Sequence, residues 1–202
     1  MPRVAGRIDL SKNEAILDAA VEVMTERGVA ASMEEIARRA CVSKQTIYNH
    51  YGSKAELISA LMARRVHEVT APLETPGAAE NPQEALAAFA RILLEMAVTP
   101  RATAFMRTAM LGASDQPELG VAVFEAGPRA SRRKLAEFLA LETAAGRLAC
   151  HDPQEAAEFF AGMVLGSHQT AALLGVDAAV DDLRIDTVAR EAARRFMRAY
   201  AP

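Results

Sequence analysis

The chain has 202 residues, a net charge of −3 and 51% hydrophobic residues, which is enough to bury a sizeable core and excludes a disordered protein. Residues 1–70 carry 10 Lys and Arg against 9 Asp and Glu, while the remainder carries 13 against 17. The small excess favours the N-terminal part as the one that approaches a polyanion. The two cysteines, Cys41 and Cys150, form no metal-binding or disulfide pattern, so we expect a reducing compartment. Ala and Leu abound and runs of β-branched residues are scarce, which predicts an all-α fold.

The first 70 residues predict four helices in succession. After a basic arm, residues 1–10, which lacks the apolar core of a signal peptide, a helix begins at Ser11 or Lys12 and ends before Gly28. The pattern S-M-E-E from Ser32 is a capping box and predicts a second helix.

A third and a fourth helix follow at once. Ser43 precedes a third helix over residues 44–51, which Gly52 ends. The pattern S-K-A-E from Ser53 is a second capping box, and it starts a fourth helix that runs to about Val69.

Residues 71–82 contain three prolines and a glycine, which indicates a loop between two parts of the chain. Beyond it the helical pattern continues. The predicted elements are a helix ended by Pro100, one over 101–113, one within 116–145 that Gly127-Pro128 kinks or splits, one from Pro153 to about Leu174, and one after Asp181–Asp182.

The run Phe159–Val176 has no charged residue over a length that could cross a bilayer. Four consecutive polar residues, Ser167 to Thr170, lie in its middle, where hydrocarbon would penalise them. We therefore expect a helix buried in a bundle and no contact with a membrane.

The short helix over residues 44–51 has an unusual polar face. At 100° per residue, Ile47 and Tyr51 point into the protein, while Gln45 and Asn49 point outward. Amide side chains can read adenine edges, and Thr or Tyr can contact a thymine methyl group. The flanks of this outward face are Thr46 and Tyr48.

Potential phosphate contacts surround these base-reading groups. They lie at or near helix N-termini or at the edge of the face: Ser32, Lys44, His50 and Lys54. Base-reading groups in the middle with phosphate contacts at the rim fit a helix in the major groove of double-stranded DNA. The plain alternative is a packed helical hairpin with a solvated polar face.

The string V-S-K-Q-T-I-Y-N-H-Y-G-S-K-A-E-L, residues 42–57, resembles the DNA-binding domain of the TetR/AcrR family of bacterial regulators, and the similarity extends over about residues 14–62. The resemblance implies about nine helices: a helix-turn-helix domain over 1–55, a connecting helix over 53–70, and an effector-binding and dimerisation domain over 71–202. The family usually has Gly in the turn where this chain has Cys41.

The resemblance further implies a cytoplasmic homodimer without cofactor or metal that binds a near-palindromic operator. It implies dimerisation mainly through the helices expected over 153–174 and after Asp182, a recognition helix that supplies Lys44 to His50, and phosphate contacts by Ser32 and Lys54. The expected function is repression released by a small, largely apolar effector, with a ligand-responsive activator as the alternative.

An enzyme is not expected, because no nucleophile–base pair, metal cluster or phosphate loop is recognisable. A third interpretation is a ligand-binding or scaffold protein that does not bind DNA. The outward polar face of the helix over residues 44–51 argues against it.

Several large side chains beyond residue 85 are candidates for an effector pocket, although most must belong to ordinary core. His168 could be the polar group of the pocket or a hydrogen-bonded core histidine. The candidates are Phe89, Met96, Phe105, Met106, Met110, Phe124, Phe138, Phe159, Met163 and His168. Gly162 and Gly166 would permit a close helix contact, either between subunits or within one.

Overall fold

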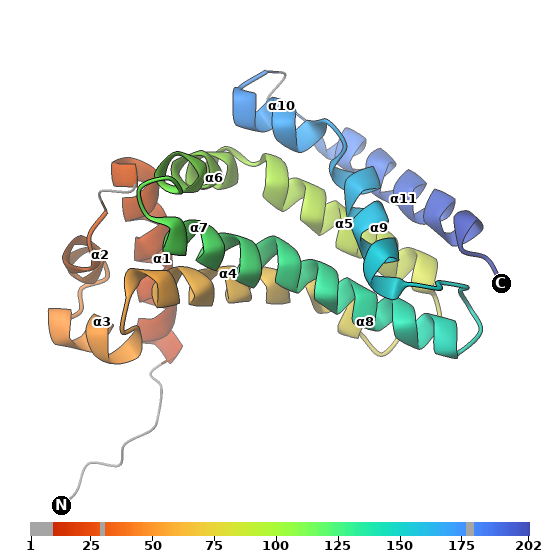
Figure 1. Cartoon of the computed structure of the whole chain (residues 1–202), viewed down its shortest axis with the longest axis horizontal. Helices are drawn as coiled ribbons and strands as arrows, with labels where there is room; N and C mark the ends of the chain where they lie inside the picture. The colour runs from red at the N-terminus through yellow and green to blue at the C-terminus, as the bar shows by residue number, and fades with distance from the viewer. Residues whose placement is uncertain (1–9, 29–30, 177–179) are drawn as a thin grey trace, which may run out of the picture.

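The computed structural model describes residues 10–28, 31–176 and 180–202, and the basic arm with Arg3 and Arg7 lies outside them. The predicted all-α fold is confirmed, because the described residues form helices and no strand (Figure 1). The elements are α1 Leu10–Arg27, α2 Met33–Arg39, α3 Lys44–His50, α4 Lys54–Thr70, the 3-10 helix η2 Ala71–Glu74, α5 Pro82–Val98, α6 Pro100–Gly112, α7 Pro117–Phe124, the π-helix η3 Glu125–Arg129, α8 Ala130–Ala144, α9 Pro153–Leu165, α10 His168–Leu174 and α11 Asp182–Ala199.

The first three helices and the start of α4 form one end of the molecule, at the left of Figure 1. Their core is fully buried and contains Ile16, Ile36, Ile47 and Leu57. It continues into side chains of α6 and α7, including Phe105, so this end is seated directly on the rest of the chain.

The remaining helices surround a second core built on α5, which packs most extensively against α11 and also contacts α9 (Figure 1). Phe89 of α5, Phe160 of α9 and Phe196 of α11 are buried here, with successive ring centroids 6.2 and 5.1 Å apart. Helix α4 contacts α7, η3 and α8, so it joins the two ends of the molecule.

The capping predictions are confirmed at Ser32 and half confirmed at Ser53. Ser32 Oγ accepts a hydrogen bond from the Glu35 amide, and the Ser32 amide donates to the Glu35 carboxylate at 3.0 Å. Ser53 likewise accepts from the Glu56 amide at 3.1 Å. The Glu56 carboxylate, however, accepts from the amide of Gly52 at 3.0 Å, one residue before the cap.

The structure differs from the predicted helices in two places. Residues 117–144 are helical throughout, because a π-turn at η3 accommodates Pro128 without a break. The helix expected over 153–174 is instead divided at Gly166, whose φ of +45° and ψ of −131° no helix can contain. None of the described helices is long and apolar enough to cross a membrane.

Cys41 lies in the turn between α2 and α3 with a φ of +55°, in the left-handed region that favours glycine. We expect Cys41→Gly to raise the free energy of unfolding by up to about 1 kcal/mol, because removing the Cβ relieves strain that exceeds the entropy cost of glycine. Urea denaturation measures this, with Cys41→Ala as the control that retains the Cβ. A Cys41→Gly variant no more stable than Cys41→Ala would contradict the expectation.

Candidate nucleic-acid interface and ligand cavity

Helix α3 is too short to be stable alone and is fixed by its inner face. Ile47 is 0% exposed and Tyr51 is 7% exposed. The Tyr51 hydroxyl donates a hydrogen bond to the Asn13 side chain on α1. The serine cap adds to this, since Ser43 Oγ accepts from the Thr46 amide at 3.0 Å. The orientation of α3 is therefore set by apolar packing from below and by hydrogen bonds at both ends.

The outer face of α3 presents amide groups to solvent. Gln45 and Asn49 are both exposed, one helical turn apart, and Gln45 Nε2 donates to Asn49 Oδ1 at 2.7 Å. This bond uses one donor and one acceptor, so the pair still offers Gln45 Oε1 as an acceptor and Asn49 Nδ2 as a donor. An acceptor and a donor side by side match the N6 and N7 groups of adenine in the major groove.

Side chains on the flanks of α3 complete this face. Tyr48 and His50 are exposed, and Thr46 is half-buried with its hydroxyl 2.8 Å from that of Ser43. Lys44 Nζ lies 5.7 Å from the centroid of the Tyr48 ring.

Three of the four residues proposed to contact phosphates, Ser32, Lys44 and Lys54, are constrained within the protein. Lys44 Nζ lies 2.5 Å from the Glu34 carboxylate, and this hydrogen bond raises the pKa of Lys44 and lowers that of Glu34. Lys44 would have to exchange Glu34 for a phosphate. Lys54 is half-buried, and burial lowers its pKa. Ser32 is held in its capping box, so the hydroxyl must serve the helix and a phosphate together.

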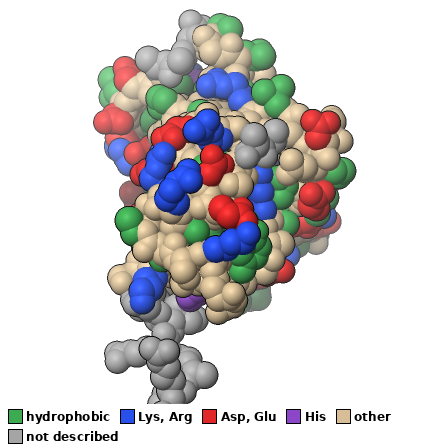
Figure 2. Space-filling view, turned by 90° about the vertical axis from the view of Figure 1, so that its left-hand side faces the viewer, with side chains coloured by type: hydrophobic (Ala, Val, Ile, Leu, Met, Phe, Trp, Pro, Cys, Tyr) green, Lys and Arg blue, Asp and Glu red, His purple; other side chains and the backbone are tan. Residues whose placement is uncertain are grey.

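Opposite charges are interleaved on the end of the molecule that carries α2 and α3, as Figure 2 shows. Arg39, for example, pairs with Glu26 at 2.7 Å and with Glu22 at 3.1 Å. Because the charge of Arg39 is offset by two glutamates, and acidic residues lie among the other cations, this face is not uniformly basic. Sequence-independent attraction to DNA is therefore expected to be modest, which leaves a larger share of binding to base contacts.

A cavity of about 140 Å³ lies deeper in the molecule, among α4, α5, α6, η3, α8, α9 and α10. Most of its lining is apolar, and α4 contributes four residues: Met62, Arg65, Val66 and Val69. Close packing along one wall depends on Gly127, since a Cβ there would lie 3.2 Å from Met62 Sδ. Helix α4, which follows the candidate DNA-contacting helix α3, thus forms one side of this cavity.

Only some of the predicted pocket residues line this cavity. Phe89, Met96 and Met106 do. Met110 and Phe124 line an adjoining hollow of about 200 Å³, which shares Met106 and Pro128 with the cavity. The two remaining buried candidates, Phe105 and Phe138, belong to the packed cores.

The three candidates from the 159–168 region do not line the cavity. Phe159 and Met163 are exposed on the outer side of α9, because Ala161 and Leu165 of the same helix turn inward. His168 is half-buried at the start of α10, and its neighbour Gln169 lines the cavity in its place.

Sequence reasoning missed the two arginines of the cavity, Arg65 and Arg132. A signal was present for the first. Met62, Arg65, Val66 and Val69 share one side of a helix at spacings of 3, 4 and 7, so a cation interrupts an otherwise apolar stripe.

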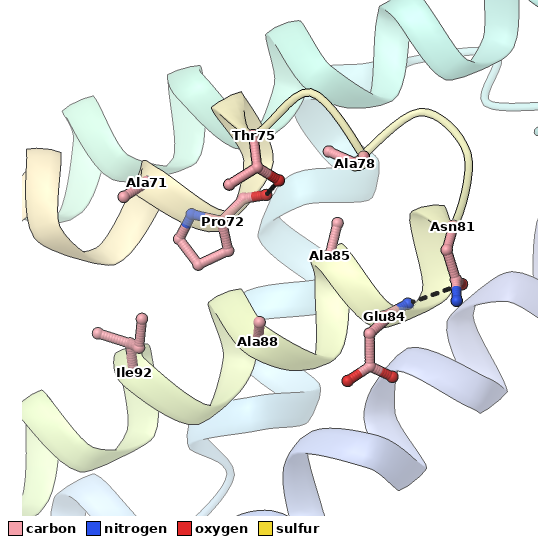
Figure 3. Close-up of a pocket in the computed structure, with 10 residues that line it drawn as sticks. Ala71, Pro72, Thr75, Ala78, Asn81, Glu84, Ala85, Ala88 and Ile92 are labelled. Carbon is pink, nitrogen blue, oxygen red and sulfur yellow. Dashed lines mark hydrogen bonds between the residues drawn. The ribbon is translucent and has the colours of Figure 1, made fainter.

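A second hollow, of about 450 Å³, lies between η2, the following loop and α5 (Figure 3). Its walls are mostly small side chains such as Ala71, Ala85 and Ala88. Asn81, at its edge, already accepts a hydrogen bond from the Glu84 amide at 3.2 Å. With few polar groups to orient a ligand, this hollow is a weaker candidate than the cavity beside α4.

Comparison with known proteins matches both parts of the chain to family models. Residues 16–61 match the model for bacterial regulatory proteins of the tetR family, and residues 84–202 match the model for the C-terminal domain of AefR-like transcriptional repressors.

Three curated relatives match short stretches of the chain. The regulator SrpR of Pseudomonas putida is 40% identical over 62 residues, 30% of this chain and 27% of that protein. The activator FasR of Mycolicibacterium smegmatis is 52% identical over 52 residues, 25% of this chain and 24% of that one. The repressor Rv3405c of Mycobacterium tuberculosis is 34% identical over 80 residues, 39% of this chain and 43% of that one. The chain therefore spans less than half the length of these curated relatives.

Solved structures resemble the whole chain. A TetR-family regulator from Mesorhizobium loti shares the fold with a TM-score of 0.76 at 24% identity, over 98% of this chain and all of that one. The flavonoid-responsive regulator FrrA is 31% identical with a TM-score of 0.71, over 95% of this chain and 97% of that one. With family models covering both its helix-turn-helix end and its C-terminal helices, the chain belongs to the tetR family of bacterial transcriptional regulators.

Proposed function

We propose that this regulator is a homodimer that represses transcription from a near-palindromic operator and is released by a small effector. The observation that carries the proposal is the exposed Gln45–Asn49 pair on a helix whose opposite side is anchored by buried Ile47. The relatives include both a repressor, Rv3405c, and an activator, FasR, so a ligand-responsive activator is the alternative. The proposed role is non-enzymatic and cytoplasmic, with a helix-turn-helix domain over 1–55, α4 as the connection, and an effector and dimerisation domain over 71–202.

DNA contact is proposed through two sets of side chains. Gln45, Asn49, Thr46 and Tyr48 would face the bases. Contacts with the phosphates would come from Ser32, Lys44, His50 and Lys54. In a dimer, the two α3 helices would lie about 34 Å apart, or a small multiple of a helical turn, and would enter successive major grooves.

The dimer is proposed to form through α9 and α11. Phe159 is 56% exposed and Met163 is 41% exposed, and with Gly162 they form a stripe on the outer side of α9. Exposed apolar side chains beside a glycine suit close packing against a second helix. The outer side of α11 is rich in arginine, with Arg194 and neighbouring cations paired to Glu191, so it suits the rim of the interface.

The effector is proposed to occupy the cavity beside α4. Because α4 lines this cavity and begins three residues after Tyr51, a ligand that repositions α4 would change the separation of the two α3 helices. The ligand shifts this equilibrium only by its unequal affinity for the two spacings. The name of the flavonoid-responsive relative FrrA supports a small organic effector.

Selection from a random DNA pool tests the function, and the expected product is a two-fold symmetric site. On that site we expect Gln45→Ala to reduce discrimination at one base pair by about 1–3 kcal/mol, with little change in affinity for random DNA. Lys54→Ala should weaken binding to every sequence and reduce the salt slope by about one. Gel-shift titrations at several salt concentrations compare the two variants. If both affect selected and random DNA identically, the assignment of the face is wrong.

A further inference from the structure

The cavity beside α4 contains a cation without a matching anion. Arg65 lines it, and among the described residues no acidic side chain or carbonyl bonds the Arg65 guanidinium. Its closest described interaction is with the Phe105 ring, whose centroid lies 5.8 Å from Cζ. Burial lowers the pKa of Arg65, as do the nearby charges of Arg101 and Arg64, whereas the charge of Glu68 raises it. A half-buried guanidinium without a direct ion pair gains from an anion that binds in the cavity.

Three other polar side chains line the cavity, Ser131, Arg132 and Gln169, and none of them supplies an anion. Arg132 donates to the Pro128 carbonyl at 3.1 Å, and its Nε lies 2.6 Å from the Glu158 carboxylate without a well-aligned hydrogen bond. Gln169 lines the cavity from α10 as a neutral group. Arg132 is therefore already paired with Glu158, whereas Arg65 has Glu68 nearby but no direct ion pair among the described residues.

The cavity is partly open to solvent, and its volume favours a small occupant. A volume of about 140 Å³ is below the range of drug-sized pockets and close to that of a cavity that holds one benzene ring. The apolar lining, which includes Phe89, Leu93 and Met96, would cover a hydrocarbon body. The Arg65 guanidinium would then pair with an acidic group attached to that hydrocarbon body.

We propose that the effector is a small monocarboxylate with an apolar body about the size of one aromatic ring, and that its carboxylate pairs with Arg65. This rests on the proposed function and adds the chemical class of the ligand. Arg65 lies 11 positions after the first residue of α4, about 16 Å along the helix at 1.5 Å per residue. The ion pair would therefore form on the helix that connects the cavity to α3.

The obvious alternative is that Arg65 is structural and keeps its charge in solvent while its stem packs on Phe105. A structural arginine predicts no preference between a charged ligand and a neutral one of the same shape. The two readings are separated by isosteric probes.

Calorimetric titration of the full-length protein with phenylacetate and with phenylacetamide provides this test, and benzoate with benzamide is a second pair. We expect each carboxylate to bind at least about tenfold more tightly than its amide, as a charge-assisted pair predicts. Arg65→Gln should remove this preference. The matched control is Arg133→Gln, an exposed arginine on α8 that does not line the cavity and should preserve the preference.

Equal affinities for carboxylate and amide, no binding of either carboxylate, or a preference that survives in Arg65→Gln would overturn the proposal. Circular dichroism establishes that each variant is folded, and Arg65→Lys should restore part of the preference. Specific operator binding is measured separately. If it is intact while the probes show no preference, the ligand class alone is wrong. If it is absent, the proposed function fails whatever the titration shows.

Discussion

Replacing Ile47 by alanine is expected to lower the free energy of unfolding by about 3 kcal/mol, within the usual range for truncating a buried aliphatic side chain. Ile47 is completely buried in the core formed by α1 to α4, so the variant would leave a cavity beneath α3. A seven-residue helix has little stability of its own and depends on this contact for its orientation. We therefore also expect a loss of operator affinity of at least tenfold, measured by gel shift.

The matched control for Ile47→Ala is Gln45→Ala, two residues earlier on the exposed side of the same helix. It should change the free energy of unfolding by less than about 0.5 kcal/mol, as exposed substitutions usually do. Urea denaturation of both variants compares the two sides of α3 directly. Similar stability losses from both substitutions would mean that α3 is not oriented as described.

Replacing Phe159 by glutamate is expected to give the second large effect, on assembly and not on folding. The ring is more than half exposed on α9, so the isolated subunit should fold normally. In a two-fold interface the substitution would place two carboxylates in a desolvated contact, and we expect the dimer dissociation constant to rise at least about a hundredfold. Sedimentation velocity at micromolar concentration should then show monomers.

Operator affinity should fall with the dimer, because each half-site would bind without the effective concentration that the second provides. Leu141→Glu is the control, since Leu141 is also exposed but belongs to α8 and not to the helices proposed for the interface. A Phe159→Glu variant that sediments as a dimer would exclude this surface. A wild-type chain that sediments as a monomer would remove the homodimer from the proposal.

The fold could be predicted closely wherever local chemistry decides the structure. Ser32 and Ser43 mark helix starts because their side chains accept hydrogen bonds from the first turn, and the structure has both caps. The inward position of Ile47 followed from the helical period alone.

The departures arise where the backbone leaves the ideal α-helical period. The Gly127-Pro128 pair predicted a kink or a split, and the structure has a π-turn there with helical residues on both sides. Gly166 was read as a contact point between helices, whereas its backbone angles end α9. Glycine permits both roles, and the sequence alone does not distinguish them.

The ligand cavity was the hardest part to predict, because a cavity is the space that several distant helices leave unfilled. Large apolar residues were chosen by type, but Phe105 and Phe138 fill core and Phe159 faces outward. Arg65 was overlooked because a single cation on a helix is usually a solvated residue. Only the packing of α4 against α5, η3 and α8 shows that Arg65 borders the cavity.

A crystal structure of the protein on its selected operator tests the central claim most directly. The account predicts the Gln45 and Asn49 amides within about 3 Å of base edges in the major groove, with the paired α3 helices one turn of DNA, or a small multiple of it, apart. A complex in which these two side chains face solvent or touch only phosphates, while another element enters the groove, would contradict it.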